Sequence, residues 1–253
     1  MVMKHFFLGS LLPSLAIGGE PPIGFEELVA LYRSNLTSAD LEKVQAIRTL
    51  IDLKNVVQLL KNKPLDLRGN FTEKELDEAL VNRVELPPYL FDALDEDEKL
   101  RNFSKVLIAY FNEEYEGFLK WYFAFEHEWR ILIAGYRSKK LGVDPAEELQ
   151  YEDFHDPLVA QILAQKDAST FEFPFEYADL GDKLKGTEGK PDEQYEAMAR
   201  YRFERVLEAT QDQPFSIDYL LGYLVQLMIV EDRFALDEKR GGEGLNEIVK
   251  GDL

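Results

Sequence analysis

Asp52-Leu-Lys-Asn55-Val-Val-Gln-Leu-Leu60-Lys61, followed after a turn by Thr72-Glu-Lys-Glu75-Leu76, is the stretch of sequence that decides the predicted fold. It places a carboxylate on an aliphatic helix, ends that helix near a basic residue, and opens a second helix beyond the turn. The same layout recurs at Glu126-His-Glu-Trp129-Arg130 and again at Ile229-Val-Glu231-Asp232-Arg233. Repetition of this kind is typical of a structural array rather than of a single active site.

The three copies predict an all-α fold built from three related helical hairpin units. We expect these units at approximately residues 25–90, 98–150 and 193–253, within a single domain of residues 1–253 that carries an irregular insertion around 150–192. The capping signals Thr37-Ser-Ala-Asp40 and Thr72-Glu-Lys-Glu75 mark helix starts in the first unit. Three equivalent helices around a common axis would present their polar groups at the same level along that axis. The predicted architecture is therefore a pseudo-threefold funnel.

Two longer regions support the helical prediction. Between roughly residues 98 and 138, apolar side chains recur at three, four and seven residues, which predicts one long helix or two nearly collinear ones. A second region runs from Glu193 through Ala209, breaks at Pro214 because proline lacks an amide donor, and restarts at Ser216 to continue to Lys239. We therefore expect a helical hairpin there.

Three other segments carry weaker signals. The acidic run Asp92–Glu98 is typical of a solvated helix start, and the glycine-rich segment Gly181–Pro191 is typical of a mobile loop. The N-terminal Lys4-His-Phe-Phe-Leu-Gly9 and the residues up to Gly18 are similar to a secretory signal. Glycine, proline and serine residues interrupt this apolar run, so a short buried N-terminal strand or turn is favoured over a signal. The later apolar segment Tyr219–Val230 is about half of the roughly 20 residues that a bilayer requires, so no direct membrane insertion is expected.

The composition limits the classes of function. A chain of 253 residues is long enough for one or two domains with a sizeable core. Its 29 lysines and arginines stand against 48 acidic residues, a formal net charge of −19, which argues against nucleic acid or anionic lipid as the main partner and favours a basic protein surface. The sequence has no cysteine and three histidines, which excludes disulfides and thiolate sites and fits the reducing cytoplasm best.

One alternative is a carboxylate-based helical metalloenzyme. Glu152 and His155 have the Glu-x-x-His spacing of di-iron helical bundles, and Glu126 and Glu128 place carboxylates on one long helix. Such bundles bring two Glu-x-x-His pairs together, whereas His127 has no glutamate three residues before it. Because no nucleophile or glycine-rich strand turn accompanies these carboxylates, a solvated helix face is the favoured interpretation, and no catalytic, cofactor or metal site is predicted.

The repeat layout resembles the socket subunit of archaeal-type and vacuolar-type rotary ATPases, which is designated C in those enzymes and d in eukaryotes. That family has three related helical units, each with an acidic residue, an Asn-Leu-Arg-like run, aliphatics, a basic turn and a short helix. Asp52-Leu-Lys-Asn55-Val56 matches this pattern best, and the ending Ile217–Leu253 is similar to the family's closing unit. Trp129 stands where the family has asparagine, and Glu231-Asp232-Arg233 replaces the Asn-Leu-Arg-like run.

The N-terminal His5-Phe-Phe-Leu-Gly-Ser-Leu-Leu-Pro13 is similar to a shorter, functionally uncharacterised bacterial family whose genes lie among those for a V-type ATP synthase. The resemblance to that family covers nearly the whole chain. The resemblance to the socket subunit, its functional relative, is concentrated at the three repeats.

The resemblance implies a non-catalytic adaptor, because the socket subunit lies on the cytoplasmic face of the membrane rotor ring and receives the foot of the central stalk. The implied partners are the central-stalk and membrane-ring subunits of a V-type ATP synthase. The implied location is cytoplasmic and peripheral to the inner membrane. An assembly or regulatory factor of the same enzyme is the alternative. The residues expected to bind the stalk or the ring are Asp52, Asn55, Glu126, Trp129, Arg130, Glu231, Asp232 and Arg233.

Overall fold

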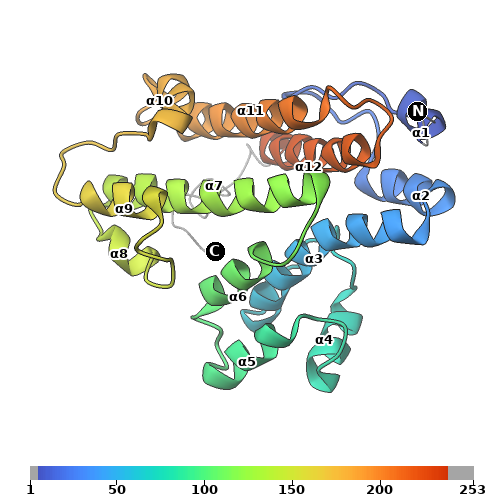
Figure 1. The fold of residues 1–253 in the computed structure, drawn as a ribbon, viewed down its shortest axis with the longest axis horizontal. Helices are drawn as coiled ribbons and strands as arrows, with labels where there is room; N and C mark the ends of the chain where they lie inside the picture. Colours follow the sequence, from blue (N-terminus) through green and yellow to red (C-terminus); the bar gives the residue numbers. More distant parts are fainter. Residues whose placement is uncertain (1–4, 239–253) are drawn as a thin grey trace. The chain divides into compact units, whose positions relative to one another are not determined.

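The computed structural model describes residues 5–238, and within that range the chain forms helices and no strand (Figure 1). The prediction of an all-α fold is therefore confirmed. None of the described helices is both long and apolar enough to cross a bilayer. Residues 239–253, the end of the third predicted unit, lie outside the described residues. The elements are α1 (Phe6–Leu11), α2 (Phe25–Asn35), α3 (Ser38–Leu60), α4 (Glu73–Asn82), α5 (Pro88–Glu96), α6 (Phe103–Phe111), α7 (Gly117–Leu141), α8 (Pro145–Glu148), α9 (Pro157–Ala164), the 3-10 helix η1 (Phe175–Tyr177), α10 (Ala178–Leu184), α11 (Pro191–Thr210) and α12 (Ile217–Glu238).

The N-terminal segment forms the short helix α1, so the predicted N-terminal strand is wrong. One of its large apolar side chains, Leu8, is buried, and the other three are exposed. Gly9 permits close packing of this helix, because a Cβ atom there would lie 2.5 Å from the ring of Phe215. Gly9, which interrupts the apolar run in the sequence, therefore lets this helix pack closely against the ring of Phe215.

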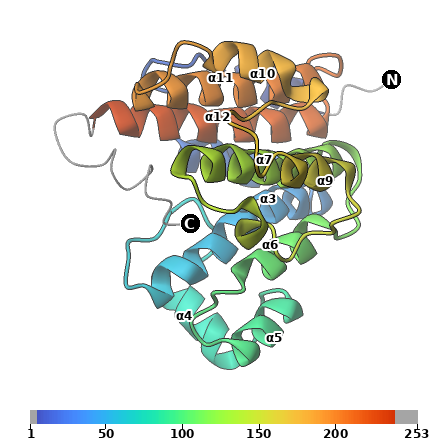
Figure 2. The same cartoon turned by 90° about the vertical axis from the view of Figure 1, so that its left-hand side faces the viewer.

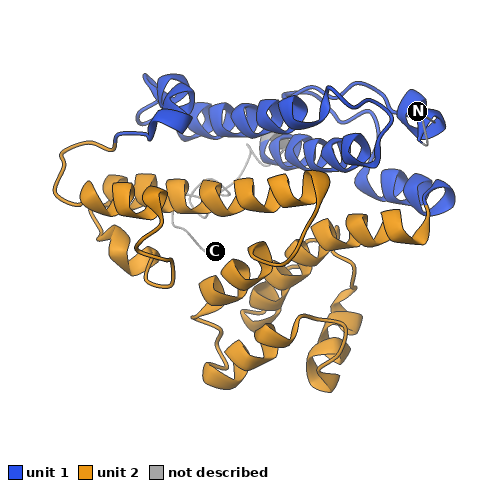
Figure 3. Cartoon of the chain, in the orientation of Figure 1, with its two compact units in different colours: residues 1–36, 172–253 blue, residues 37–171 orange. Residues whose placement is uncertain are grey.

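The chain forms two compact units (Figure 3). Unit 1 takes its described residues from 1–36 and 172–253, and unit 2 consists of residues 37–171. Unit 1 is thus assembled from two segments that are far apart in the sequence. The division into three related units and the funnel arrangement stay predictions.

Unit 1 is built on the hairpin of α11 and α12, which confirms the predicted hairpin (Figure 2). Pro214 lies in the turn between these helices, as its missing amide donor requires. The two helices approach closely at Gly222, where a Cβ atom would come within 2.6 Å of the methyl group of Thr210. The hydroxyl group of Tyr32 donates a 2.7 Å hydrogen bond to the carbonyl oxygen of Leu220, which attaches α2 to the hairpin.

In unit 2 the region between residues 98 and 138 forms two helices that fold back on each other, so the prediction of one helix or a collinear pair is wrong. α6 ends at Phe111, and α7 begins at Gly117, whose φ of 57° lies in the left-handed region that suits a turn. The ring centres of Tyr110 and Phe123 lie 5.2 Å apart, and those of Phe111 and His127 lie 5.5 Å apart. The aromatic periodicity therefore comes from two helices that pack their aromatic faces together.

Two surface segments also differ from their predictions. The acidic run Asp92–Glu98 covers the end of α5 instead of a helix start, because Pro88 begins that helix earlier. The first residues of the Gly181–Pro191 segment belong to α10, whose Leu180 and Leu184 are buried. A helix of two turns is too short to show a clear apolar period in the sequence.

Candidate partner-binding site

α3 carries three polar side chains on one buried face. Arg48, Asp52 and Asn55 follow one another at spacings of four and three residues, which places them on the same side of the helix. Their exposed fractions are 5%, 0% and 1%. Buried polar groups need hydrogen-bond partners, and the segment that follows α3 supplies them.

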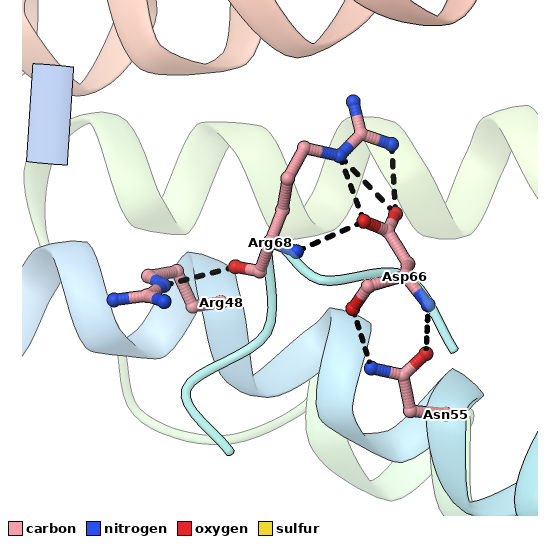
Figure 4. Close-up of polar contacts among 4 residues, drawn as sticks. All are labelled: Arg48, Asn55, Asp66 and Arg68. Carbon is pink, nitrogen blue, oxygen red and sulfur yellow. Dashed lines mark hydrogen bonds and ion pairs between the residues drawn. The ribbon is translucent and has the colours of Figure 1, made fainter. Parts of the chain in front are cut away.

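Asn55 binds both backbone groups of Asp66. Its Nδ2 donates a hydrogen bond to the carbonyl oxygen of Asp66, and its Oδ1 accepts one from the backbone N–H of Asp66, each 2.8 Å long (Figure 4). The carboxylate of Asp66 accepts hydrogen bonds from the backbone N–H of Arg68 at 3.0 Å and from its Nη2 at 2.7 Å. Burial alone raises the pKa of Asp66, but the hydrogen bonds and charge of Arg68 outweigh this effect and hold the pKa below its ordinary value.

Arg48 binds two successive carbonyl groups further along the loop, those of Arg68 and Gly69. Its Nε donates a 2.9 Å hydrogen bond to the carbonyl oxygen of Arg68 (Figure 4), and its Nη2 donates one to the carbonyl oxygen of Gly69. The planar guanidinium group presents donors in a fixed fork, which suits two successive carbonyls. Two consecutive peptide groups are thereby tied to α3.

Asp52 holds the far end of the same loop. Its Oδ2 accepts a 2.8 Å hydrogen bond from Nδ2 of Asn70, and its Oδ1 accepts a 3.3 Å bond from the backbone N–H of Phe71. Gly69 gives these groups room, because a Cβ atom there would lie 2.3 Å from Oδ1 of Asp52. Burial raises the pKa of Asp52, and the hydrogen bonds from Asn70 and Phe71 and the charge of Arg48 only partly offset this effect.

These contacts define a clamped loop, residues 61–71, that three side chains of α3 hold in place. Leu67 lies within this loop and is 79% exposed. Single exposed apolar side chains are common on protein surfaces, but one on a loop that is already ordered can meet another protein at little cost in conformational entropy. Since Asp52 and Asn55 are buried beneath the loop, a partner would meet the loop and not these two side chains.

The second copy also binds a segment that follows its helix. Oε1 of Glu152 accepts a 3.1 Å hydrogen bond from Nη1 of Arg130, and its Oε2 lies 2.8 Å from Nε2 of His127. Arg130 also donates to the hydroxyl oxygen of Ser104 on α6. Burial lowers the pKa of Arg130, and the neighbouring charge of Glu152 acts in the opposite direction. The cluster joins α7 to α6 and to the turn after α8.

Glu126 and Trp129 are the other two candidate residues of the second copy. Glu126 is 8% exposed, and Trp129 is partly buried at the end of a row of rings along α7. The ring centres of Trp129 and Phe125 lie 6.1 Å apart, and the nearly parallel rings of Phe125 and Trp121 lie 5.2 Å apart. Each such ring pair stabilises the helix by about 0.5–1.5 kcal/mol beyond its burial.

The third copy contacts elements that precede it in the sequence. Oε1 of Glu231 accepts a 2.8 Å hydrogen bond from the backbone N–H of Phe25, the first residue of α2. Arg233 is 5% exposed, and its Nη2 donates a 3.3 Å hydrogen bond to Oε2 of Glu196 on α11. Asp232 is partly exposed. The third copy therefore braces unit 1 and has no equivalent of the clamped loop in the described residues.

The carboxylates of the metalloenzyme alternative do not converge in the structure. Glu152 is buried against His127 and Arg130, whereas His155 is exposed in the turn region that follows. Glu128 is exposed on α7. Over residues 5–238, no three His, Cys, Asp or Glu side chains are grouped in a way that could hold a metal ion.

Sequence reasoning missed the residues that complete these clusters. Arg48 stands four residues before Asp52, a helical spacing that could have included it. The run Asp66-Leu-Arg-Gly-Asn70 contains turn-forming residues and could have been identified as an ordered turn. The contact of His127 with Glu152 spans 25 residues and has no local signal.

Similarity to other proteins extends along nearly the whole chain. A family model described as "Protein of unknown function (DUF2764)" matches residues 2–251. The chain belongs to the DUF2764 family. The described residues of both units of this DUF2764 chain fall within the matched range, so the clamped loop and the hairpin lie in the region that defines the family. The predicted membership of an uncharacterised family is confirmed to that extent, whereas its link to a V-type ATP synthase stays a prediction.

Individual relatives match over the same length. An uncharacterized protein of Chlamydia trachomatis is 28% identical, with 97% of each chain covered. Uncharacterized proteins of Chlamydia muridarum and Chlamydia pneumoniae are each 26% identical, with 98% of each chain covered. No solved structure matches this DUF2764 chain.

Proposed function

We propose that this DUF2764 chain is a non-catalytic rotor-coupling subunit of a V-type ATP synthase, which links the central stalk to the membrane rotor ring. Its resemblance to the socket subunit is strongest at Asp52 and Asn55. The observation that carries the proposal is that these two residues fasten a surface loop to a long helix. An adaptor that transmits torque needs a stiff connection of this kind between its frame and its contact surface.

The hydrogen bonds that attach the clamped loop to α3 would carry force from the loop into this helix. Backbone groups at positions 66, 68, 69 and 71 are hydrogen-bonded to side chains of α3. The helix has 23 residues, which corresponds to a length of about 35 Å. A contact surface that is ordered before binding loses little conformational entropy when it meets its partner.

The net negative charge of the chain favours a partner whose contact surface is basic. A formal net charge of −19 attracts a basic protein surface, increases the rate of encounter and helps to fix orientation. A basic foot of the central stalk would provide that surface. The protein would then lie in the cytoplasm, peripheral to the inner membrane through its complex.

Isolation of the native ATP synthase, with the copies of each polypeptide counted, tests the proposal. Under mild, low-salt conditions we expect stable co-purification with the stalk and ring proteins, at one copy per rotor. A protein that stays alone when the intact complex is isolated would overturn the proposal. Substoichiometric, transient association would support an assembly or regulatory factor instead.

Metal analysis of the purified chain separates the adaptor from the carboxylate-based enzyme. Near-stoichiometric iron, manganese or zinc that is lost in Glu152→Ala would favour the enzyme. The variant must first be shown to keep its helical content, because Glu152 also binds Arg130 and His127.

A further inference from the structure

The clamped loop has a local charge opposite to that of the whole chain. Between positions 54 and 70 there are four basic residues and one acidic residue, Asp66, a formal charge of +3 in a chain of −19. Lys54 lies on α3 next to Asn55, which binds the loop. Lys61 is exposed where the loop begins, and Lys63 is partly exposed within it.

The exposed apolar residue of this basic surface is held in a defined position. Leu67 is 79% exposed and lies between Asp66 and Arg68, whose side chains are joined at 2.7 Å. The backbone on both sides of Leu67 is hydrogen-bonded to α3 through Asn55 and Arg48. The loop therefore presents one aliphatic side chain, in a segment that also carries Lys61 and Lys63, without the entropy cost of ordering a free loop.

We infer that the clamped loop inserts Leu67 into an apolar pocket with an acidic rim on another protein. An acidic rim complements Lys61 and Lys63, and a pocket removes the exposed leucine from water. A second copy of this chain fits less well, because two chains of −19 repel each other. An anionic membrane is also disfavoured, since three net charges and one leucine give weak attraction against the charge of the whole chain. The inference concerns the chemistry of the partner and does not depend on the rotor assignment.

Two labelled helical peptides of equal length test this inference on the full chain. Both carry a stripe of leucines, and the positions that flank this stripe on either side are glutamates in one peptide and lysines in the other. Leu67→Ser should weaken binding of the glutamate peptide by about tenfold, the effect of losing one well-buried aliphatic side chain. Val81→Ser is the matched control, because Val81 is 75% exposed on α4 of the same unit. It should leave the binding unchanged, and the double charge reversal Lys61→Glu with Lys63→Glu should weaken it.

Several outcomes would overturn the inference. These are binding of the glutamate peptide that does not depend on Leu67, equal losses in Leu67→Ser and Val81→Ser, and binding of the lysine peptide that depends on Leu67. A dimer in sedimentation that Leu67→Ser converts to a monomer would assign the loop to a second copy. Leu67-dependent binding to phosphatidylglycerol vesicles would assign it to a membrane. Each of these failures leaves co-purification with the ATP synthase unaffected, so the inference and the proposed function fail separately.

Discussion

Oε1 of Glu231 accepts a hydrogen bond from the backbone amide of Phe25, which lies 206 residues earlier in the chain. Phe25 is the first residue of α2, and the residue before it, Gly24, has no side chain that could cap the helix. A carboxylate at a helix N-terminus accepts from an amide that lacks an intrahelical acceptor and complements the helix dipole. Unit 1 therefore joins its two chain segments partly through a helix cap supplied by α12.

Loss of this cap should destabilise unit 1. Glu231→Ala is expected to lower the free energy of unfolding by about 1–2 kcal/mol, because it removes the carboxylate that accepts from the amide of Phe25. Glu231→Gln keeps an acceptor oxygen, so its free energy of unfolding should fall by less. Urea unfolding followed by circular dichroism measures both effects. The control Glu20→Ala, at an exposed position of the same unit, should leave the free energy of unfolding nearly unchanged. If Glu20→Ala lowered it as much as Glu231→Ala does, the role of the cap would be contradicted.

Asp52 should give the stability of unit 2 a pH dependence of defined sign. Burial raises the pKa of Asp52 in the folded chain, so the folded chain holds this proton more tightly than the unfolded chain does. The stabilisation is complete below the unfolded pKa of about 3.9 and is lost as the pH rises through the folded pKa. The stability of the wild type relative to Asp52→Asn should therefore fall as the pH rises above about 4. Urea unfolding across this range measures the difference.

Asp66 provides the matched control for that measurement. Its folded pKa is lowered, so its contribution is present above the unfolded pKa and is lost as the pH falls through the folded pKa. The stability of the wild type relative to Asp66→Asn should therefore rise with pH over the acidic range. If the Asp52 difference also rose with pH, the hydrogen bonds from Asn70 and Phe71 and the charge of Arg48 would together outweigh burial, and the assignment for Asp52 would be wrong.

Arg48→Lys should loosen the clamped loop without removing the positive charge. Lysine lacks the fork that binds the carbonyl groups of Arg68 and Gly69, so at least one of these hydrogen bonds is lost. We expect amide hydrogen exchange in residues 66–71 to accelerate by about tenfold, the effect of about 1.4 kcal/mol. Hydrogen-exchange mass spectrometry measures this. Arg33→Lys, at an exposed position, should leave the loop unchanged, and an unaltered loop in Arg48→Lys would refute the clamp.

Glu152→Ala should destabilise the second cluster more than the loss of a surface charge would. It leaves the largely buried Arg130 without its carboxylate partner, at an expected cost of about 2–3 kcal/mol. Adding Arg130→Met should recover part of this loss, because it removes the unpaired charge. Thermal and urea unfolding provide the comparison, with the exposed Glu98→Ala as control. A double variant as unstable as the sum of the two single variants would indicate that the pair is not coupled.

Features that depend on neighbours in the sequence could be predicted. Thr72 and Glu75 form the expected capping box, with the Thr72 hydroxyl oxygen accepting from the backbone of Glu75 and the Glu75 carboxylate accepting from the backbone of Thr72. Pro214 breaks the helical region where its missing donor requires a break. Both are decided within a few residues, so a single sequence contains the necessary information.

Features that depend on distant partners could not be predicted. α1 packs against the ring of Phe215 at Gly9, and nothing near Gly9 in the sequence indicates that ring. Asp52 and Asn55 were identifiable as unusual polar residues on an aliphatic helix, but the loop that they bind is only defined once the chain has folded. The distinction between a contact surface and its support therefore requires the structure.

The clamped loop also contains the peptide bond between Arg68 and Gly69, which trypsin recognises by its arginine. A protease must draw several residues into its cleft in an extended form, and Arg48 holds the carbonyl group of this bond and that of the next one. Cleavage after Arg68 therefore requires α3 to release the loop first, so the digestion rate reports how often the clamp opens. A partner that covers Leu67 would protect the same bond, which makes limited proteolysis a direct measure of occupancy at this surface.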